Sequence, residues 1–207
     1  MYGDYFFVRN ILSVADQNIL SKLVASSDLP YRFYVSHNYF DGEPDPRFVD
    51  PMQLTHHLYM KEDGENKEIV SPHFEKFVPL IMSLKSYFGN IQLLRMKVNV
   101  GFMQPETVRY TPQVPHVDLK YDNGEVVPHW VCVYYLDYND APTYLFKENL
   151  EIAEKIKPEK GTALFFDGST LHAGSNPALE PLRFVVNIDF IPEKIPSKIF
   201  NISQSKN

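Results

Sequence analysis

The stretch 182–190, LRFVVNIDF, decides the fold because its side chains alternate in character. Every second residue is strongly apolar, and the intervening positions hold Arg183, Val185, Asn187 and Asp189. A period of two predicts a β-strand. We expect its apolar face to pack on helices and its other face to point into a barrel. A barrel mouth lined by polar groups is a typical small-molecule site.

The same pattern extends through the second half of the chain. Alternation at 94–100 (LRMKVNV) and the apolar β-rich run 130–136 (WVCVYYL) predict two more strands, the latter buried on both faces. Shorter strands are expected at 116–119, 143–146 and 162–166, whereas 147–157 is ambiguous between helix and strand. Turn signals such as Asp122-Asn123-Gly124 separate them.

The first ninety residues look different. Helical spacing predicts one helix over 14–25, capped by Ser13, and a second over 74–88 that Gly89 ends and Pro79 either kinks or starts. We expect 30–70 to be irregular. Two helices followed by about eight short strands predict a mainly β (α+β) jelly roll or double-sheet barrel, with the N-terminal helices buttressing one sheet.

Composition limits the remaining possibilities. With 207 residues we expect one domain over 1–207: a helical and loop support region (1–90), a barrel core (91–192) and a C-terminal tail (193–207). The net charge of −6 argues against nucleic acid as a partner. No secretory leader or membrane-length apolar run is visible, which favours the cytoplasm. Cys132 lies in an apolar run and is interpreted as a small buried hydrophobe.

Two histidines and one aspartate suggest a metal site. His116 and Asp118 are two residues apart on an expected strand, so their side chains leave the same face, and His172 follows about fifty residues later. Two imidazoles and one carboxylate with open positions are the ligand set of non-haem Fe(II) oxygenases. The alternative is a structural arrangement, because an H-x-D pair alone is a weak signal.

The region 91–192 resembles the 2-oxoglutarate/Fe(II)-dependent dioxygenases, in particular their prolyl-4-hydroxylase-like branch. The matching stretches are PHVD (115–118), VCVYYLD (131–137), KPEKGTALFF (157–166), LHAGSNP (171–177) and LRFVVNIDF (182–190). The resemblance implies a double-stranded β-helix and a hydroxylase that consumes 2-oxoglutarate and O2 and releases succinate and CO2. His116, Asp118 and His172 then correspond to the catalytic iron ligands.

The resemblance also implies contacts to 2-oxoglutarate. Arg183 corresponds to the residue that pairs with its distal carboxylate, and a guanidinium suits that task because its planar fork donates two parallel hydrogen bonds. The alternative for Arg183 is a surface ion pair. Tyr135 corresponds to a tyrosine that reaches the same carboxylate, or is an ordinary core aromatic. Asn99 lies on the polar face of its strand and could touch co-substrate or substrate.

The substrate stays open between a prolyl residue in a peptide and a small amino-acid-like metabolite. A different function is a non-catalytic, cupin-like module that binds a metal or small molecule; it would have no need of a buried Arg183. A related halogenase is disfavoured because Asp118 supplies the carboxylate that chloride would replace. The loops 37–55 and 101–115 are candidate lids, since long loops with proline and glycine often cover sites.

Overall fold

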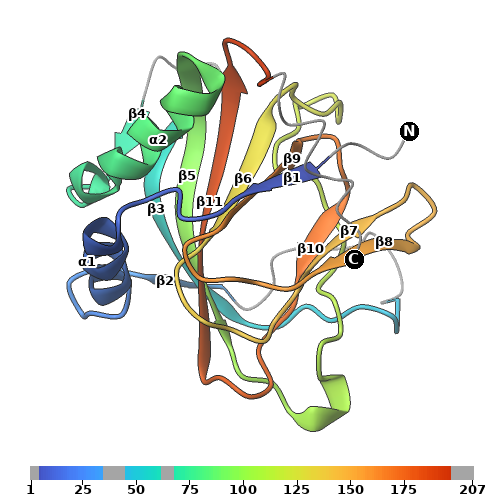
Figure 1. Cartoon of the computed structure of the whole chain (residues 1–207). Coiled ribbons are helices and arrows are strands. Elements are labelled where there is room, and N and C mark those ends of the chain that lie inside the picture. The colour runs from blue at the N-terminus through green and yellow to red at the C-terminus, as the bar shows by residue number, and fades with distance from the viewer. Residues whose placement is uncertain (1–4, 35–44, 62–67, 197–207) are drawn as a thin grey trace.

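A computed structural model gives the fold of residues 5–34, 45–61 and 68–196 (Figure 1). One antiparallel sheet of eight strands forms its centre. Along this sheet the order is β1 (Tyr5–Val8), β9 (Ala163–Asp167), β6 (Trp130–Tyr135), β11 (Leu182–Pro192), β5 (Ile91–Phe102), β3 (Gln53–Lys61) and β2 (Arg32–Tyr34), with β4 (Glu68–Val70) paired to β3. A sheet of three strands lies opposite, in the order β10 (His172–Gly174), β7 (Thr143–Phe146) and β8 (Ile152–Ile156).

Both predicted helices are confirmed. Helix α1 (Val14–Val24) begins at Ser13, whose Oγ accepts a hydrogen bond from the Asp16 amide at 3.1 Å. A 3-10 turn, Phe74–Phe77, leads into α2 (Val78–Phe88). Pro79 lies in the first turn of α2, so it marks the start of that helix rather than a kink. Gly89 ends it with a φ of 72°.

The two helices cover one face of the large sheet, as Figure 1 shows. Leu80, Leu84 and Phe88 of α2 belong to the same buried cluster as Val186 and Ile188 of β11, together with Leu20, Val24, Val98 and Phe190. The predicted packing of the apolar face of 182–190 is therefore confirmed. Burying each such side chain contributes about 1.5–3 kcal/mol.

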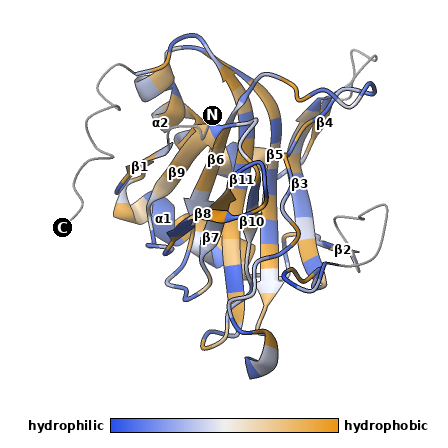
Figure 2. Cartoon of the chain, turned by 90° about the vertical axis from the view of Figure 1, so that its right-hand side faces the viewer, coloured by the Kyte–Doolittle hydropathy of each residue, from blue (hydrophilic) through white to orange (hydrophobic). Residues whose placement is uncertain are grey.

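A second buried cluster fills part of the space between the two sheets. Val133, Leu164 and Val185 from the large sheet meet Leu145 and Ile156 from the small one. The rest of that space is polar, because the inward positions of β5 and β11 carry hydrophilic residues. Figure 2 shows the alternation of hydrophilic and hydrophobic residues along β5 and β3. This arrangement of two facing sheets is the jelly roll, or double-stranded β-helix, that the sequence predicts.

The strands predicted at 94–100, 130–136, 143–146 and 162–166 are present as β5, β6, β7 and β9, and the ambiguous stretch 147–157 contains β8. Cys132 is fully buried, as expected. No helix in the described part of the chain is long and apolar enough to cross a membrane.

Two secondary-structure predictions are wrong. Residues 30–70 are not simply irregular, because β2, β3 and β4 extend the large sheet there. The stretch 116–119 is not a strand: His116 makes a single bridge and Asp118 lies in a bend. The helical and loop support region therefore also contributes strands to the sheet.

Candidate functional site

His116 and His172 are joined by their main chains. The amide of each donates a hydrogen bond to the carbonyl of the other, and both bonds measure 3.0 Å. This antiparallel bridge continues the small sheet beyond β10. It puts both imidazoles on one side, with ring centroids 4.8 Å apart. The chain thus brings the two predicted histidines together although fifty-six positions separate them.

Asp118 completes the predicted group. One ligand atom from each of His116, Asp118 and His172 can be chosen so that all three lie within 4.8 Å of one another. Oδ2 of Asp118 lies 3.1 Å from Nε2 of His172. Among the described residues no other group of three or more such side chains meets this test.

The donor atoms fit a divalent metal. Nδ1 of His116 lies 3.0 Å from the Val114 carbonyl oxygen, and Nδ1 of His172 lies 3.0 Å from that of Thr170. Each Nδ1 therefore carries the proton, which leaves Nε2 as the lone-pair donor, as in metal-ligating histidines. Nε2 of His172 is buried and faces Oδ2 of Asp118, the neighbouring candidate ligand atom. Burial, followed by the proximity of His172, lowers the pKa of His116 to about 4, so its imidazole is neutral.

Asp118 is surrounded by cations. Arg95 donates a hydrogen bond to its Oδ1, Lys97 Nζ lies 3.6 Å from the same oxygen, and Asn187 donates to Oδ2 at 3.0 Å. Burial opposes ionisation, but Arg95 and Lys97 outweigh it and hold the pKa of Asp118 well below its ordinary value. Asp118 is therefore a carboxylate, which is the form a metal requires.

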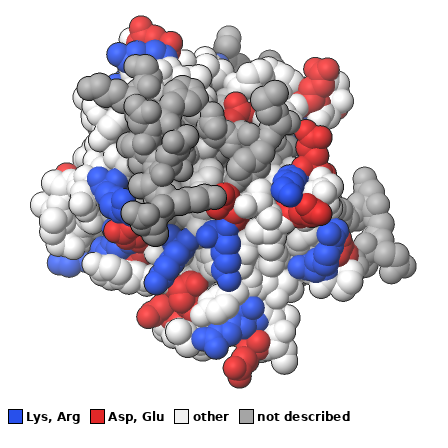
Figure 3. Space-filling view, turned by 45° about the vertical axis from the view of Figure 1, so that its right-hand side comes forward, with Lys and Arg blue, Asp and Glu red and all other residues white. Residues whose placement is uncertain are grey.

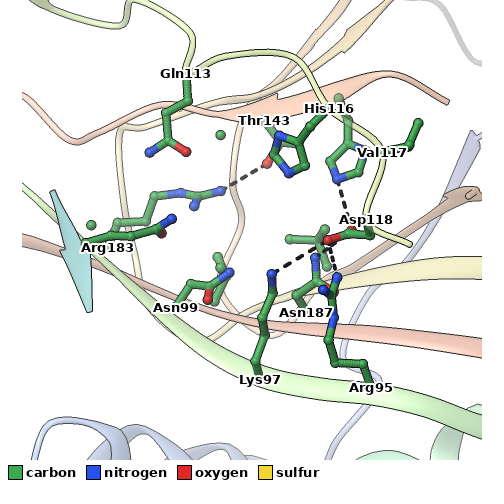
Figure 4. Close-up of a pocket in the computed structure, with 16 residues that line it drawn as sticks. Arg95, Lys97, Asn99, Gln113, His116, Val117, Asp118, Thr143, Arg183 and Asn187 are labelled. Atoms are coloured by element: carbon green, nitrogen blue, oxygen red, sulfur yellow. Dashed lines mark hydrogen bonds and ion pairs between the residues drawn. The ribbon is translucent and has the colours of Figure 1, made fainter. Parts of the chain in front are cut away.

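Arg183 lies at the other end of the same cavity (Figure 4). It is 8% exposed, and its Nη2 donates to Thr143 Oγ1 at 3.1 Å. No carboxylate of the described residues lies within ion-pair distance, and its Nε has no hydrogen-bond partner there. The surface ion pair considered above is therefore wrong. Burial lowers the pKa of Arg183, although Tyr135 and Asp137 act in the opposite direction.

Of the two other predicted co-substrate contacts, Asn99 lines the cavity and Tyr135 does not. The Tyr135 hydroxyl donates to Thr143 Oγ1 at 2.9 Å, so it lies behind Thr143 and does not line the cavity. Asn99 does line it, and its Oδ1 accepts a hydrogen bond from Thr55 Oγ1 at 3.1 Å. Thr143 was not recognised from the sequence, where it appears only as the start of a strand.

Arg95 and Lys97 are further residues that the sequence analysis missed. They share the inward face of β5 with Asn99 because the three alternate along the strand. Asp189 of β11 lies opposite Arg95 and accepts its Nε–H at 2.7 Å. The alternation of apolar and polar residues in LRMKVNV (94–100) could have indicated that these polar side chains share one face of the strand. His129 is buried nearby, with Nε2 3.7 Å from Asp189 Oδ1.

The cavity has a volume of about 230 Å3 and is mainly polar. Figure 4 shows Arg183 and Gln113 on one side, the His116–Asp118 group on the other, and Lys97 and Asn99 on the wall between them. His56 lies elsewhere, bonded to the Pro30 carbonyl and Ser71. Of the candidate lids, Gln113 of the 101–115 loop lines the cavity, whereas 37–44 lies outside the described residues.

Figure 3 shows the charge on one face of the molecule. Lysine and arginine side chains are interspersed with aspartate and glutamate among the described residues of this face, without a continuous basic stripe.

Comparisons with solved structures show which proteins share this fold. An oxidoreductase of the 2OG-Fe(II) oxygenase family from Burkholderia pseudomallei superposes with a TM-score of 0.67 at 11% identity, covering 94% of this chain and 88% of that one. A prolyl hydroxylase from Trichoplax adhaerens, in complex with a hypoxia inducible factor peptide fragment, gives 0.56 at 13%, covering 98% and 87%. HygX from Streptomyces hygroscopicus, with nickel, 2-oxoglutarate and hygromycin B bound, gives 0.53 at 12%, covering 92% and 84%.

No protein-family model and no curated protein matches the sequence. At these identities the structural likeness shows the fold alone. The chain has the fold of the 2-oxoglutarate/Fe(II) oxygenases, prolyl hydroxylases among them.

Proposed function

We propose that this protein is an Fe(II)- and 2-oxoglutarate-dependent oxygenase that hydroxylates a small-molecule or peptide substrate. His116, Asp118 and His172 hold the iron, and Arg183 holds the distal carboxylate of 2-oxoglutarate. Fe(II) bound there supplies the activation of O2 that couples conversion of 2-oxoglutarate to succinate and CO2 with hydroxylation of the substrate. These assignments are supported by the donor geometry and by the fold.

One observation carries the proposal: a buried arginine, with no carboxylate of the described residues within ion-pair distance, shares a cavity with the His-Asp-His group. An isolated buried charge is costly unless an anion joins it. Arg183 therefore gains most from a ligand that brings a carboxylate, and the planar fork favours a bidentate pair. Thr143 positions the guanidinium through Nη2, and Tyr135 holds the Thr143 hydroxyl.

Other residues of the cavity wall supply its apolar surface and fix the orientation of Asp118. The apolar side chains of the cavity wall are Val117, Val133 and Val185. Arg95 and Asn187 hold the two oxygens of Asp118 in a fixed orientation. An oriented carboxylate loses little freedom when it binds a metal.

The competing function is a non-catalytic, cupin-like binding module. Such a module keeps the fold and a metal but has no use for a co-substrate anchor. The burial of Arg183 and its position in the cavity favour the oxygenase.

Anaerobic titration separates these functions. Protein loaded with Fe(II) is titrated with 2-oxoglutarate, and the weak visible charge-transfer band is recorded; O2 is then admitted and succinate is measured. The oxygenase develops the band and forms succinate. A metal-binding protein that develops neither is the cupin-like module.

Two broader assignments belong to the same proposal. We propose one domain over 1–207, which limited proteolysis tests, and a cytoplasmic location, which cell fractionation tests. The candidate substrates remain a prolyl residue of a peptide and an amino-acid-like metabolite.

A further inference from the structure

With metal and 2-oxoglutarate bound, the charges of the cavity would not be fully balanced. Its walls carry three cations, Arg95, Lys97 and Arg183, and the anion Asp118. Arg95 is matched by Asp118 and by Asp189 behind it. The cations Arg95, Lys97 and Arg183 and the anions Asp118 and Asp189 sum to one positive charge. A divalent metal and a dianionic co-substrate cancel each other, so the loaded cavity keeps one positive charge in excess, and Lys97 makes the longest of the ion contacts there.

The contacts of Lys97 confirm that it is poorly matched. Its Nζ lies 3.6 Å from Asp118 Oδ1, which is longer than a hydrogen bond, and that oxygen already accepts a hydrogen bond from Arg95. The Lys97 side chain is only 14% exposed, so solvent screens it weakly. An ammonium in this position is stabilised by any anion that enters the cavity.

Asn99 adds a second donor beside Lys97. The two residues are two positions apart on β5, so both side chains point into the cavity. The Asn99 Oδ1 is occupied by the Thr55 hydroxyl, and Thr55 itself is 1% exposed. The amide group therefore presents its Nδ2 hydrogens to the cavity. An ammonium and an amide N–H pair facing one space form a site for an oxyanion.

We propose that Lys97 and Asn99 form a second anion subsite, which binds the carboxylate of the primary substrate. This inference rests on the proposed function, because it assigns 2-oxoglutarate to Arg183. Lys97 lies close to the oxygen of a metal ligand, so the bound carboxylate lies near the metal and the hydroxylated carbon is only a few bonds from it. The substrate is thus a small carboxylic acid, such as a free amino acid, and not an internal residue of a peptide.

The size of the cavity supports a small substrate. A volume of about 230 Å3 has to hold 2-oxoglutarate and the reacting part of the substrate. Ligand cavities for single drug-sized molecules occupy about 300–1,000 Å3. A compact acid fits the remaining space, with its charge at Lys97.

Paramagnetic line broadening tests the subsite without turnover. Protein loaded with Mn(II) and 2-oxoglutarate under nitrogen is mixed with acetate or, separately, with acetamide. We expect the acetate methyl resonance to broaden and that of acetamide, which has the same shape and no charge, to stay narrow. The free amino acids and their amides are then compared in the same way, with dipeptides ending in the same residue to distinguish a free acid from a peptide C-terminus.

Variants assign the effect to the subsite. Lys97→Met and the isosteric Asn99→Asp should each weaken acetate binding at least tenfold, while 2-oxoglutarate affinity changes much less. Lys22→Met, on the exposed side of α1, is the matched control and should behave as the wild type. Thermal unfolding checks that each variant is folded.

Three results have different meanings. Failure of the wild type to bind 2-oxoglutarate removes the proposed function itself. Normal 2-oxoglutarate binding with equal broadening of acetate and acetamide, or with broadening unchanged in Lys97→Met, overturns the subsite alone. Equal loss of acetate and 2-oxoglutarate in Lys97→Met also overturns it, because Lys97 would then hold the co-substrate.

Discussion

The two ends of the cavity differ in how their buried charges are balanced. At the Arg183 end a buried cation donates a hydrogen bond to the Thr143 hydroxyl, and no carboxylate of the described residues lies within ion-pair distance. At the Asp118 end a buried anion is surrounded by Arg95 and Lys97, and Asn187 adds a further donor. The first end lacks a charge that a ligand must bring. The second end holds its own charge in place, so that a metal meets an oriented carboxylate.

The largest effect is expected at the anionic end. Asp118→Ala removes a metal ligand and also leaves Arg95 and Lys97 facing the metal without compensation, so we expect metal affinity to fall more than a hundredfold. Titration with Mn(II), followed by electron paramagnetic resonance, measures it. Asp122→Ala, at the exposed hairpin turn, is the matched control. Near-normal metal binding by Asp118→Ala would contradict the ligand assignment.

Arg183→Ala tests the cationic end. Losing one partner of a buried charge pair costs about 2–5 kcal/mol, or roughly 30- to several thousand-fold in affinity. We expect the Kd for 2-oxoglutarate to rise by that factor while metal affinity is largely kept. Arg183→Lys should recover only part of the loss, because an ammonium cannot form the bidentate pair. An unchanged Kd in Arg183→Ala would show that another residue binds the distal carboxylate of 2-oxoglutarate.

Asp189→Asn tests whether Asp189 helps to orient Asp118 through Arg95, which hydrogen-bonds to both. Asp189 is fully buried and accepts a hydrogen bond from Arg95 at 2.7 Å. Without its charge, Arg95 pairs with Asp118 alone and competes with the metal. We expect metal affinity to fall about 10–100-fold, the usual range for residues that orient a ligand, with 2-oxoglutarate affinity of the metal-saturated protein unchanged. Equal effects on both affinities would mean that the two ends are not independent.

Thr143→Val is expected to have a smaller effect at the cationic end. It removes the hydroxyl that accepts hydrogen bonds from both Arg183 and Tyr135. This hydroxyl orients the guanidinium and does not replace its charge, so 2-oxoglutarate affinity should fall about 2–12-fold, which corresponds to about 0.5–1.5 kcal/mol. Calorimetric titration under nitrogen measures this. A loss as large as that of Arg183→Ala would show that Thr143 contacts the co-substrate itself.

The pH dependence of the metal-free protein gives the mildest test. The pKa of His116 falls from about 6.5 when unfolded to about 4 when folded, because burial disfavours the charged ring. The unfolded chain therefore binds the proton first as pH falls, and stability is lost between about pH 6.5 and 4. His116→Gln should flatten the urea-unfolding free energy over this window. An unaltered slope would show that the ring is already solvated.

Much of the fold could be predicted from local patterns. The capped helix α1, the start of α2 near Pro79 and the alternation of β11 all depend on neighbouring residues, and each agrees with the structure. Strand β3 was missed because a register shift between His57 and Tyr59 interrupts its alternation. Its stability comes from pairing with β5, far along the chain, which a local pattern does not contain.

The site could be predicted in part for the same reason. The spacing of His116, Asp118 and His172 singled out the three side chains, although the strand expected at 116–119 is a single bridge followed by a bend. The roles of Arg95 and Lys97 depend on register: β11 sets Asp189 opposite Arg95 and Asn187 opposite Lys97. Alternation says which residues share a face, but it does not say what lies across from them.

The bridge between His116 and His172 has a consequence for redesign. It uses amide and carbonyl groups only, so it is indifferent to which side chain either position carries. Exchanging an imidazole for a carboxylate or thiolate would remove its Nδ1 hydrogen bond to the Val114 or Thr170 carbonyl but would leave the main-chain bridge in place. Metal preference in this barrel is open to change one residue at a time.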